Sequence, residues 1–160
     1  MKYKNLQNNR GFVLLFAVTL SALLLAIAVG VTNIAFREIR FSTNAIASND
    51  AFFAADTGIE CALFHDKSAN SVFDEEGGIV QCLGGDGIDI EDSSPWSFTI
   101  SGFGSSNKSC VHVTVTKDPL VIPITTIVSK GYNVGEDDGD GTGCVSSDPN
   151  RVERQLEVRY

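Results

Sequence analysis

The feature that most constrains this chain is an uncharged apolar segment near its N-terminus. Residues 12–36 contain neither a charged residue nor a proline, and fifteen of these 25 residues are Leu, Ile, Val or Phe. A helix of about 20 apolar residues covers the hydrocarbon core of a bilayer. Each large apolar side chain near the helix centre favours insertion by roughly 0.3 to 0.6 kcal/mol. The segment therefore predicts a membrane-spanning helix rather than a buried helix of a soluble protein.

The residues before this segment predict its orientation. The first ten residues carry Lys2, Lys4 and Arg10 and no acidic residue, which places them on the cytoplasmic side by the positive-inside rule. A secretory signal peptide has a shorter apolar region and a small-residue cleavage site at its far end, and residues 32–37 offer no such site. We therefore expect a single-pass membrane protein with a cytoplasmic N-terminus and an extracytoplasmic C-terminal domain.

The border between the basic leader and the apolar segment reads Arg10-Gly11-Phe12. A short basic leader that ends in glycine, followed by an apolar residue and a long hydrophobic helix, resembles the prepilin signal of type IV pilins and type II secretion pseudopilins. Residues 51–60, with the sequence AFFAADTGIE, are similar to the alanine-rich and aromatic-rich helix of many minor pilins. The resemblance covers residues 1–64, and the rest of the chain resembles the family only in its layout.

The resemblance implies a processing event and a set of partners. Prepilin peptidase would cleave between Gly11 and Phe12, remove the leader 1–11 and leave Phe12 as an N-methylated first residue. The helix of residues 12–36 would stay in the membrane until it packs in a filament at the cell surface or in the periplasm. The implied partners are other pilin or pseudopilin subunits, prepilin peptidase, the inner-membrane assembly platform and, before assembly, membrane lipid.

One departure from the family pattern bears on the position of the subunit. The usual glutamate at the fifth mature position is replaced by Phe16. In the family this carboxylate is thought to pair with the N-terminal amine of a neighbouring subunit, an attraction that a low-dielectric setting strengthens. Members without it include minor pseudopilins at the filament tip. The resemblance therefore implies a minor, tip or priming subunit.

Beyond residue 36 the helical pattern becomes amphipathic. Residues 37–64 predict a continuation of the helix in which one stripe packs on a globular domain. The stripe is expected to consist of Ile39, Ile46 and Phe53 at heptad spacing, followed by Phe52, Ala55, Ile59, Ala62 and Leu63.

Residues 65–160 predict an extracytoplasmic, β-rich globular domain. Residues 65–95 read as a loop region with one short strand near 79–83. Alternating or β-branched residues predict four further strands, at 96–100, 110–115, 120–129 and 152–160. The fold class expected is α+β: a long N-terminal helix, membrane-spanning in its first half, packed on a small antiparallel sheet as in pilins.

The charge balance excludes one class of partner. The chain carries 12 Lys and Arg against 20 Asp and Glu, a net charge of −8. Removing the three basic residues of the leader leaves nine against twenty, or −11. General nucleic-acid binding requires basic residues that neutralise phosphates, so we do not expect nucleic acid as a partner.

Four cysteines lie beyond the apolar segment, an even number that predicts two disulfides on the translocated side. Three pairings are possible. We favour Cys61 with Cys82 and Cys110 with Cys144, because these pairs close the shorter loops. Each bond is worth about 2 to 4 kcal/mol in a small domain. The spacings contain no C-x-x-C pair, which disfavours a zinc site as the alternative.

An acidic, glycine-rich segment is the main candidate metal site in the sequence. Glu136, Asp137, Asp138 and Asp140 lie among glycines, and calcium takes six to eight oxygen ligands from flexible loops of this kind. Some pseudopilins bind calcium near their C-terminal loops. The spacing is not that of an EF-hand, and a solvated acidic turn is the alternative interpretation. A second acidic loop has a weaker claim and contains Asp86, Asp89, Glu91 and Asp92.

No pattern predicts an enzyme. His65 is expected to be a cation at a helix end and His112 a solvent-facing strand residue. No serine stands in a G-x-S-x-G motif, and no glycine-rich phosphate loop is present. The expected function is a structural pilin or pseudopilin subunit with no cofactor other than calcium. The alternative is a membrane-anchored extracytoplasmic binding module, with calcium as a candidate requirement.

Overall fold

The computed structural model describes residues 10–68, 71–74, 77–90, 94–118, 120, 124–137 and 143–160. The chain divides into two compact units, Met1–Thr43 and Asn44–Tyr160. Each unit is described by itself. One helix, α1, contributes residues to both of them.

Helix α1 runs over Arg10–Asp66, a length of 57 residues. It contains no proline, and Leu and Ala, two of the strongest helix formers, are abundant in its first half. The hydroxyl groups of this half donate hydrogen bonds to backbone carbonyls three or four residues earlier: Thr19 to Leu15 and Phe16, Ser21 to Val18, and Thr32 to Ala28. These bonds satisfy the three hydroxyl groups within the largely apolar segment without any outside partner.

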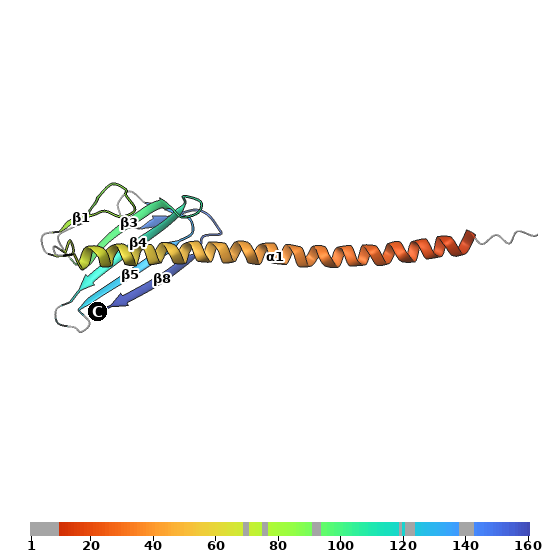
Figure 1. Cartoon of the computed structure of the whole chain (residues 1–160), viewed down its shortest axis with the longest axis horizontal. Helices are drawn as coiled ribbons and strands as arrows, with labels where there is room; N and C mark the ends of the chain where they lie inside the picture. The colour runs from red at the N-terminus through yellow and green to blue at the C-terminus, as the bar shows by residue number, and fades with distance from the viewer. Residues whose placement is uncertain are drawn as a thin grey trace, which may run out of the picture. The chain divides into compact units, whose positions relative to one another are not determined.

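The second unit contains a four-stranded antiparallel sheet in the order β3-β4-β5-β8 (Figure 1). Its strands are β3 (Trp96–Phe103), β4 (Ser109–Lys117), β5 (Thr125–Tyr132) and β8 (Glu153–Arg159). Two smaller antiparallel pairs accompany it: β1 (Gly78–Val80) with β2 (Ile88–Ile90), and β6 (Glu136–Asp137) with β7 (Cys144–Val145). The α+β fold class predicted from the sequence is confirmed.

The predicted strands agree with the structure except at three places. The strand predicted at 79–83 overlaps β1, which ends at Val80. Its partner β2 was not predicted, because Ile88-Asp89-Ile90 is short and lies among glycines. For the strand predicted at 120–129, the described strand is β5 from Thr125 onward, and residues 121–123 lie outside the described residues. The two-residue strands β6 and β7 carry no alternating pattern and were also missed.

The helix packs on the sheet through small residues. Ala51, Ala54, Ala55, Gly58 and Ala62 are buried together with Ile59, and Val111, Val113 and Val115 of β4 line the opposing side of the same interface. A Cβ atom on Gly58 would lie 2.7 Å from a methyl carbon of Val111. The absence of larger side chains on this face therefore allows the helix to lie very close to the sheet.

The predicted packing stripe was partly wrong. Ala55, Ile59 and Ala62 face the core as expected, but the heptad residues Ile39, Ile46 and Phe53 are exposed. For Ile46 and Phe53 the physical reason is the close helix-to-sheet approach, since bulky side chains would hold the two elements apart; Ile39 belongs to the first unit. The prediction was based on hydrophobicity and therefore included the large apolar residues, whereas the observed interface buries the small ones.

The core of the domain lies between this helix face and the sheet. Its largest fully buried side chains are Phe73 and Phe98, whose rings stack at a centroid distance of 6.2 Å. Trp96, the only tryptophan of the chain, contacts Phe73 and is 5% exposed. Leu156 and Val158 of β8 are partly buried against the same cluster.

Candidate functional site

The first half of α1 presents apolar side chains on all sides. From Phe12 onward the large apolar residues up to Phe36 are exposed in the monomer, and the helix includes a span long and apolar enough to cross a membrane. Such a helix requires lipid or other helices around it, because water would leave its entire surface unfavourably hydrated. Arg37 is the first charged residue after this surface.

The predicted processing junction lies at the start of this helix. Helix α1 begins at Arg10, so Gly11 and Phe12 belong to its first turn. Phe12 and Phe16 are both exposed. The leader residues 1–9 lie outside the described residues. Cleavage at Gly11 and methylation of Phe12 stay predictions from the sequence.

A second apolar surface lies on the domain half of α1, opposite the small-residue face. Ile46, Phe53 and Phe64, which we call the outer stripe, are 56%, 62% and 73% exposed. They follow one another after seven and eleven residues, both close to a whole number of helical turns. They therefore lie along one line on the helix. The ring of Phe52 lies edge to face with the ring of Phe53, with 5.9 Å between the two centroids. The sequence analysis identified Ile46 and Phe53 as packing residues but wrongly predicted that they pack on the globular domain.

The end of α1 is fixed to the sheet by a buried carboxylate. The Asp66 side chain is 7% exposed and lies 2.6 Å from the ammonium nitrogen of Lys117 on β4. It also accepts hydrogen bonds from the hydroxyl groups of Tyr160 and Ser71. Burial raises the pKa of the Asp66 carboxyl, but the bonds from Lys117, Tyr160 and Ser71 and the charge of Lys117 together hold this pKa below its ordinary value. No local sequence pattern predicts this cluster, because Lys117 and Tyr160 are far from Asp66 in the chain.

The hydrogen bond to Asp66 also affects the phenol group of Tyr160. Burial and the neighbouring Asp66 carboxylate raise the pKa of Tyr160, so its hydroxyl keeps its proton and remains a donor to the carboxylate. The ammonium of Lys67 lies 4.2 Å above the Tyr160 ring. The C-terminal residue is thereby held against the end of α1.

The four cysteines form the two disulfides predicted, Cys61 with Cys82 and Cys110 with Cys144. The first joins α1 to the segment after β1, and the second joins β4 to β7. Together they connect the helix and the small β6–β7 pair to the body of the domain. This pattern supports an extracytoplasmic location, where disulfides form and persist.

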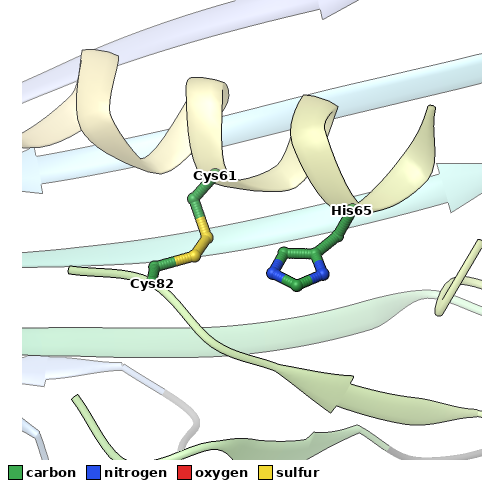
Figure 2. A group of neighbouring side chains, drawn as sticks. All are labelled: Cys61, His65 and Cys82. Carbon is green, nitrogen blue, oxygen red and sulfur yellow. A yellow bond between two sulfur atoms is a disulfide. The ribbon is translucent and has the colours of Figure 1, made fainter. Parts of the chain in front are cut away.

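Figure 2 shows that His65 lies beside the Cys61–Cys82 disulfide. It occupies the last turn of α1, the helix end at which it was expected, and its Nε2 atom lies 3.1 Å and 3.2 Å from the backbone oxygen and nitrogen of Gln81. The ligand atoms of Cys61, His65 and Cys82 all lie within 4.8 Å of one another. His112 is half-buried rather than solvent-facing and lies 3.1 Å from the Thr99 hydroxyl.

The predicted calcium ligands are only partly described. Glu136 and Asp137 are exposed and form the two-residue strand β6, whereas Asp138 and Asp140 lie outside the described residues. Successive strand residues point to opposite faces, so Glu136 and Asp137 do not present their carboxylates to one ion. Glu136 also lines a cavity of about 690 Å³ together with Lys108, whose positive charge opposes cation binding there. Calcium binding stays a prediction from the sequence.

No family model, no curated protein and no solved structure matches this chain. The architecture itself is pilin-like: a long N-terminal apolar helix whose domain half packs on an antiparallel sheet.

Proposed function

We propose that this chain is a structural subunit of a type IV pilus or of a type II secretion-like filament, and that it acts without catalysis. The observation that carries the proposal is the apolar surface of α1. Residues 12–36 expose apolar side chains on all sides, and the outer stripe of Ile46, Phe53 and Phe64 adds a second apolar surface on the domain half. In an isolated monomer the outer stripe would stay exposed to water. Its apolar side chains along one line of the helix are suited to packing against a neighbouring helix.

The proposed mechanism has two stages. In the first, the basic leader orients the helix in the membrane, and prepilin peptidase removes residues 1–11, after which Phe12 is N-methylated. In the second, an assembly platform moves the subunit from lipid into a bundle of like helices. Contacts with lipid tails are then replaced by contacts with helices of neighbouring subunits, so the apolar surface of residues 12–36 stays covered throughout.

Phe16 supports a minor subunit at the tip or in priming. At the fifth mature position a phenylalanine offers no charge for a neighbour's N-terminal amine, so the subunit does not need such a neighbour on that side. The disulfides and the apolar helix support the corresponding location, with the domain outside the cytoplasm and the helix as its anchor before assembly.

The outer stripe provides the test of this proposal. Phe53→Glu should lower incorporation into filaments by more than about tenfold, since burial of a phenylalanine is worth roughly 1.5 to 3 kcal/mol and about 1.4 kcal/mol corresponds to a factor of ten. The free energy of unfolding of the domain should change by less than about 0.5 kcal/mol, because Phe53 is exposed in the monomer. Incorporation is measured by filament recovery from a complemented deletion strain.

Ser106→Glu is the matched control, because it adds the same charge at an exposed position in the β3–β4 turn. It should leave incorporation unchanged. Normal incorporation of Phe53→Glu would show that the outer stripe contacts no other subunit. In that case the alternative, a membrane-anchored binding module that never polymerises, becomes the better account.

A further inference from the structure

Strand β8 forms one edge of the four-stranded sheet, and in the described part of the chain no strand pairs with its outer side (Figure 1). Its residues, Glu153–Arg159, pair with β5 in one unbroken register. An edge strand presents a row of free backbone N–H and C=O groups, which another chain can use for strand pairing. β8 is therefore a candidate interaction surface.

The opposite edge of the sheet is protected against such pairing. The register of β3 shifts between Ser101 and Phe103, and Gly102 between them has a φ angle of 79°. An irregularity of this kind bends an edge strand and interrupts its row of free groups. β8 has no register shift, no proline and no lysine, so its charged side chains decide which chain can pair with it.

The hydrogen bonds to β5 determine which residues of β8 have free backbone groups. Directly after β8, Tyr160 and Thr125 exchange both of their backbone hydrogen bonds. In an antiparallel pair such exchanges recur at every second residue, so Val158, Leu156 and Arg154 also bond to β5. The remaining residues point their N–H and C=O groups to the free edge: Glu153, Gln155, Glu157 and Arg159.

The charges along this edge are complementary to those of a second copy of the same edge. In an antiparallel pair of β8 strands centred on Leu156, Glu153 of each copy lies opposite Arg159 of the other. Gln155 then lies opposite Glu157, which adds no contact between like charges. All four side chains are exposed in the monomer. Opposite charges across a strand pair contribute roughly 0.2 to 1 kcal/mol each, whereas like charges are destabilising.

The same charges exclude the neighbouring registers. A slip of the pairing by one residue would set free backbone groups against bonded ones, so only slips by two residues are compatible with the hydrogen bonds. In the register centred on Gln155, Glu153 lies opposite Glu157, and in the register centred on Glu157 that residue lies opposite itself. Both registers set like charges against each other. Of the three, only the register centred on Leu156 avoids this.

We propose that two copies of this chain join their β8 strands in this register, antiparallel about a two-fold axis at Leu156, to form one continuous sheet. Each edge-facing pair exchanges two backbone hydrogen bonds. Leu156, which is partly buried against the core, meets its counterpart on the α1 side of the sheet. Arg159 already contacts Glu157 of its own strand and gains Glu153 of the second copy.

The two-fold axis stands perpendicular to the joined sheet, so the domain halves of the two α1 helices lie on the same face and run in opposite directions. Subunits of one filament all run in the same direction. The pair therefore links copies from two filaments or from two facing membranes, and it is distinct from the helix packing through the outer stripe. The inference rests on the domain alone and does not depend on the proposed filament function.

The test follows the full chain in detergent by sedimentation at concentrations from about 1 to about 100 µM. Wild type should be dimeric at the upper end of this range. Glu153→Arg and Arg159→Glu should each weaken the dimer by at least about tenfold, because each replaces two attractive pairs with two repulsive ones. An equimolar mixture of the two variants should dimerise again, since every pair formed between them joins opposite charges.

Glu60→Arg is the matched control, because it makes the same change at an exposed residue of α1, and it should leave the dimer unchanged. Association through the apolar segment 12–36 would persist in both β8 variants, so the comparison separates the two contacts. The proposal is overturned if wild type stays monomeric up to about 100 µM, if either β8 variant dimerises as tightly as wild type, or if the mixture stays monomeric. The wild-type measurement needs no substitution, so it does not depend on the folding of a variant.

Discussion

Gly131→Ala should destabilise the domain by at least about 3 kcal/mol, near the upper end of the range for overpacked cores. A Cβ atom at this position of β5 would lie 2.2 Å from the backbone oxygen of Ala51 and 2.2 Å from the backbone nitrogen of Ala55. Backbone atoms of a helix cannot rotate away as a side chain can, so the added methyl group must push α1 off the sheet. Denaturant unfolding followed by the fluorescence of the buried Trp96 measures the effect.

Gly85→Ala is the matched control for this substitution. The nearest atom to a Cβ there is the backbone oxygen of Cys82 at 3.6 Å, an ordinary contact. The expected change in the free energy of unfolding is therefore within about 0.5 kcal/mol. If the Gly131→Ala variant is as stable as the Gly85→Ala variant, α1 does not pack on the sheet as closely as described here.

Asp66→Asn should destabilise the domain by roughly 2 to 3 kcal/mol at neutral pH, because it leaves the Lys117 ammonium without its partner at the end of α1. The effect should depend on pH. The pKa of Asp66 is lower in the folded chain than its ordinary value, so the stability it contributes is complete above about pH 5 and is lost as the pH falls through the folded pKa. The difference between wild type and variant should therefore shrink as the pH falls below the ordinary pKa of an aspartate carboxyl.

Glu60→Gln serves as the control, since Glu60 is exposed on the same helix. It should leave stability nearly unchanged at all these pH values. The measurement is the free energy of unfolding of wild type and both variants at a series of pH values from neutral to acidic. A constant difference between wild type and Asp66→Asn across this range would contradict the ion pair with Lys117.

Much of the fold was predictable because it depends on local patterns. The charge-free segment after Arg10 and the absence of proline in residues 12–66 predict the helix, and alternating residues such as those of 110–115 predict the main strands. The disulfide pairing also followed from sequence, because both bonds join neighbouring cysteines.

The remaining features depend on contacts between distant residues, which no local pattern reports. Gly131 and Ala55 are separated by most of the domain, yet their close approach determines which face of α1 is buried. For the same reason the outer-stripe residues Ile46 and Phe53 were assigned to the core. Asp66 meets Lys117 and Tyr160 only in the folded chain, and a charged residue at a helix end predicts neither partner.

The central claim, that this chain is a filament subunit processed at Gly11, is tested most directly by its N-terminus. The protein is recovered from membranes of cells with and without prepilin peptidase, and the N-terminal residue and the intact mass are measured. The account predicts a chain that begins at methylated Phe12 only when the peptidase is present. An unprocessed Met1 in both strains, or cleavage after Phe36, would contradict it.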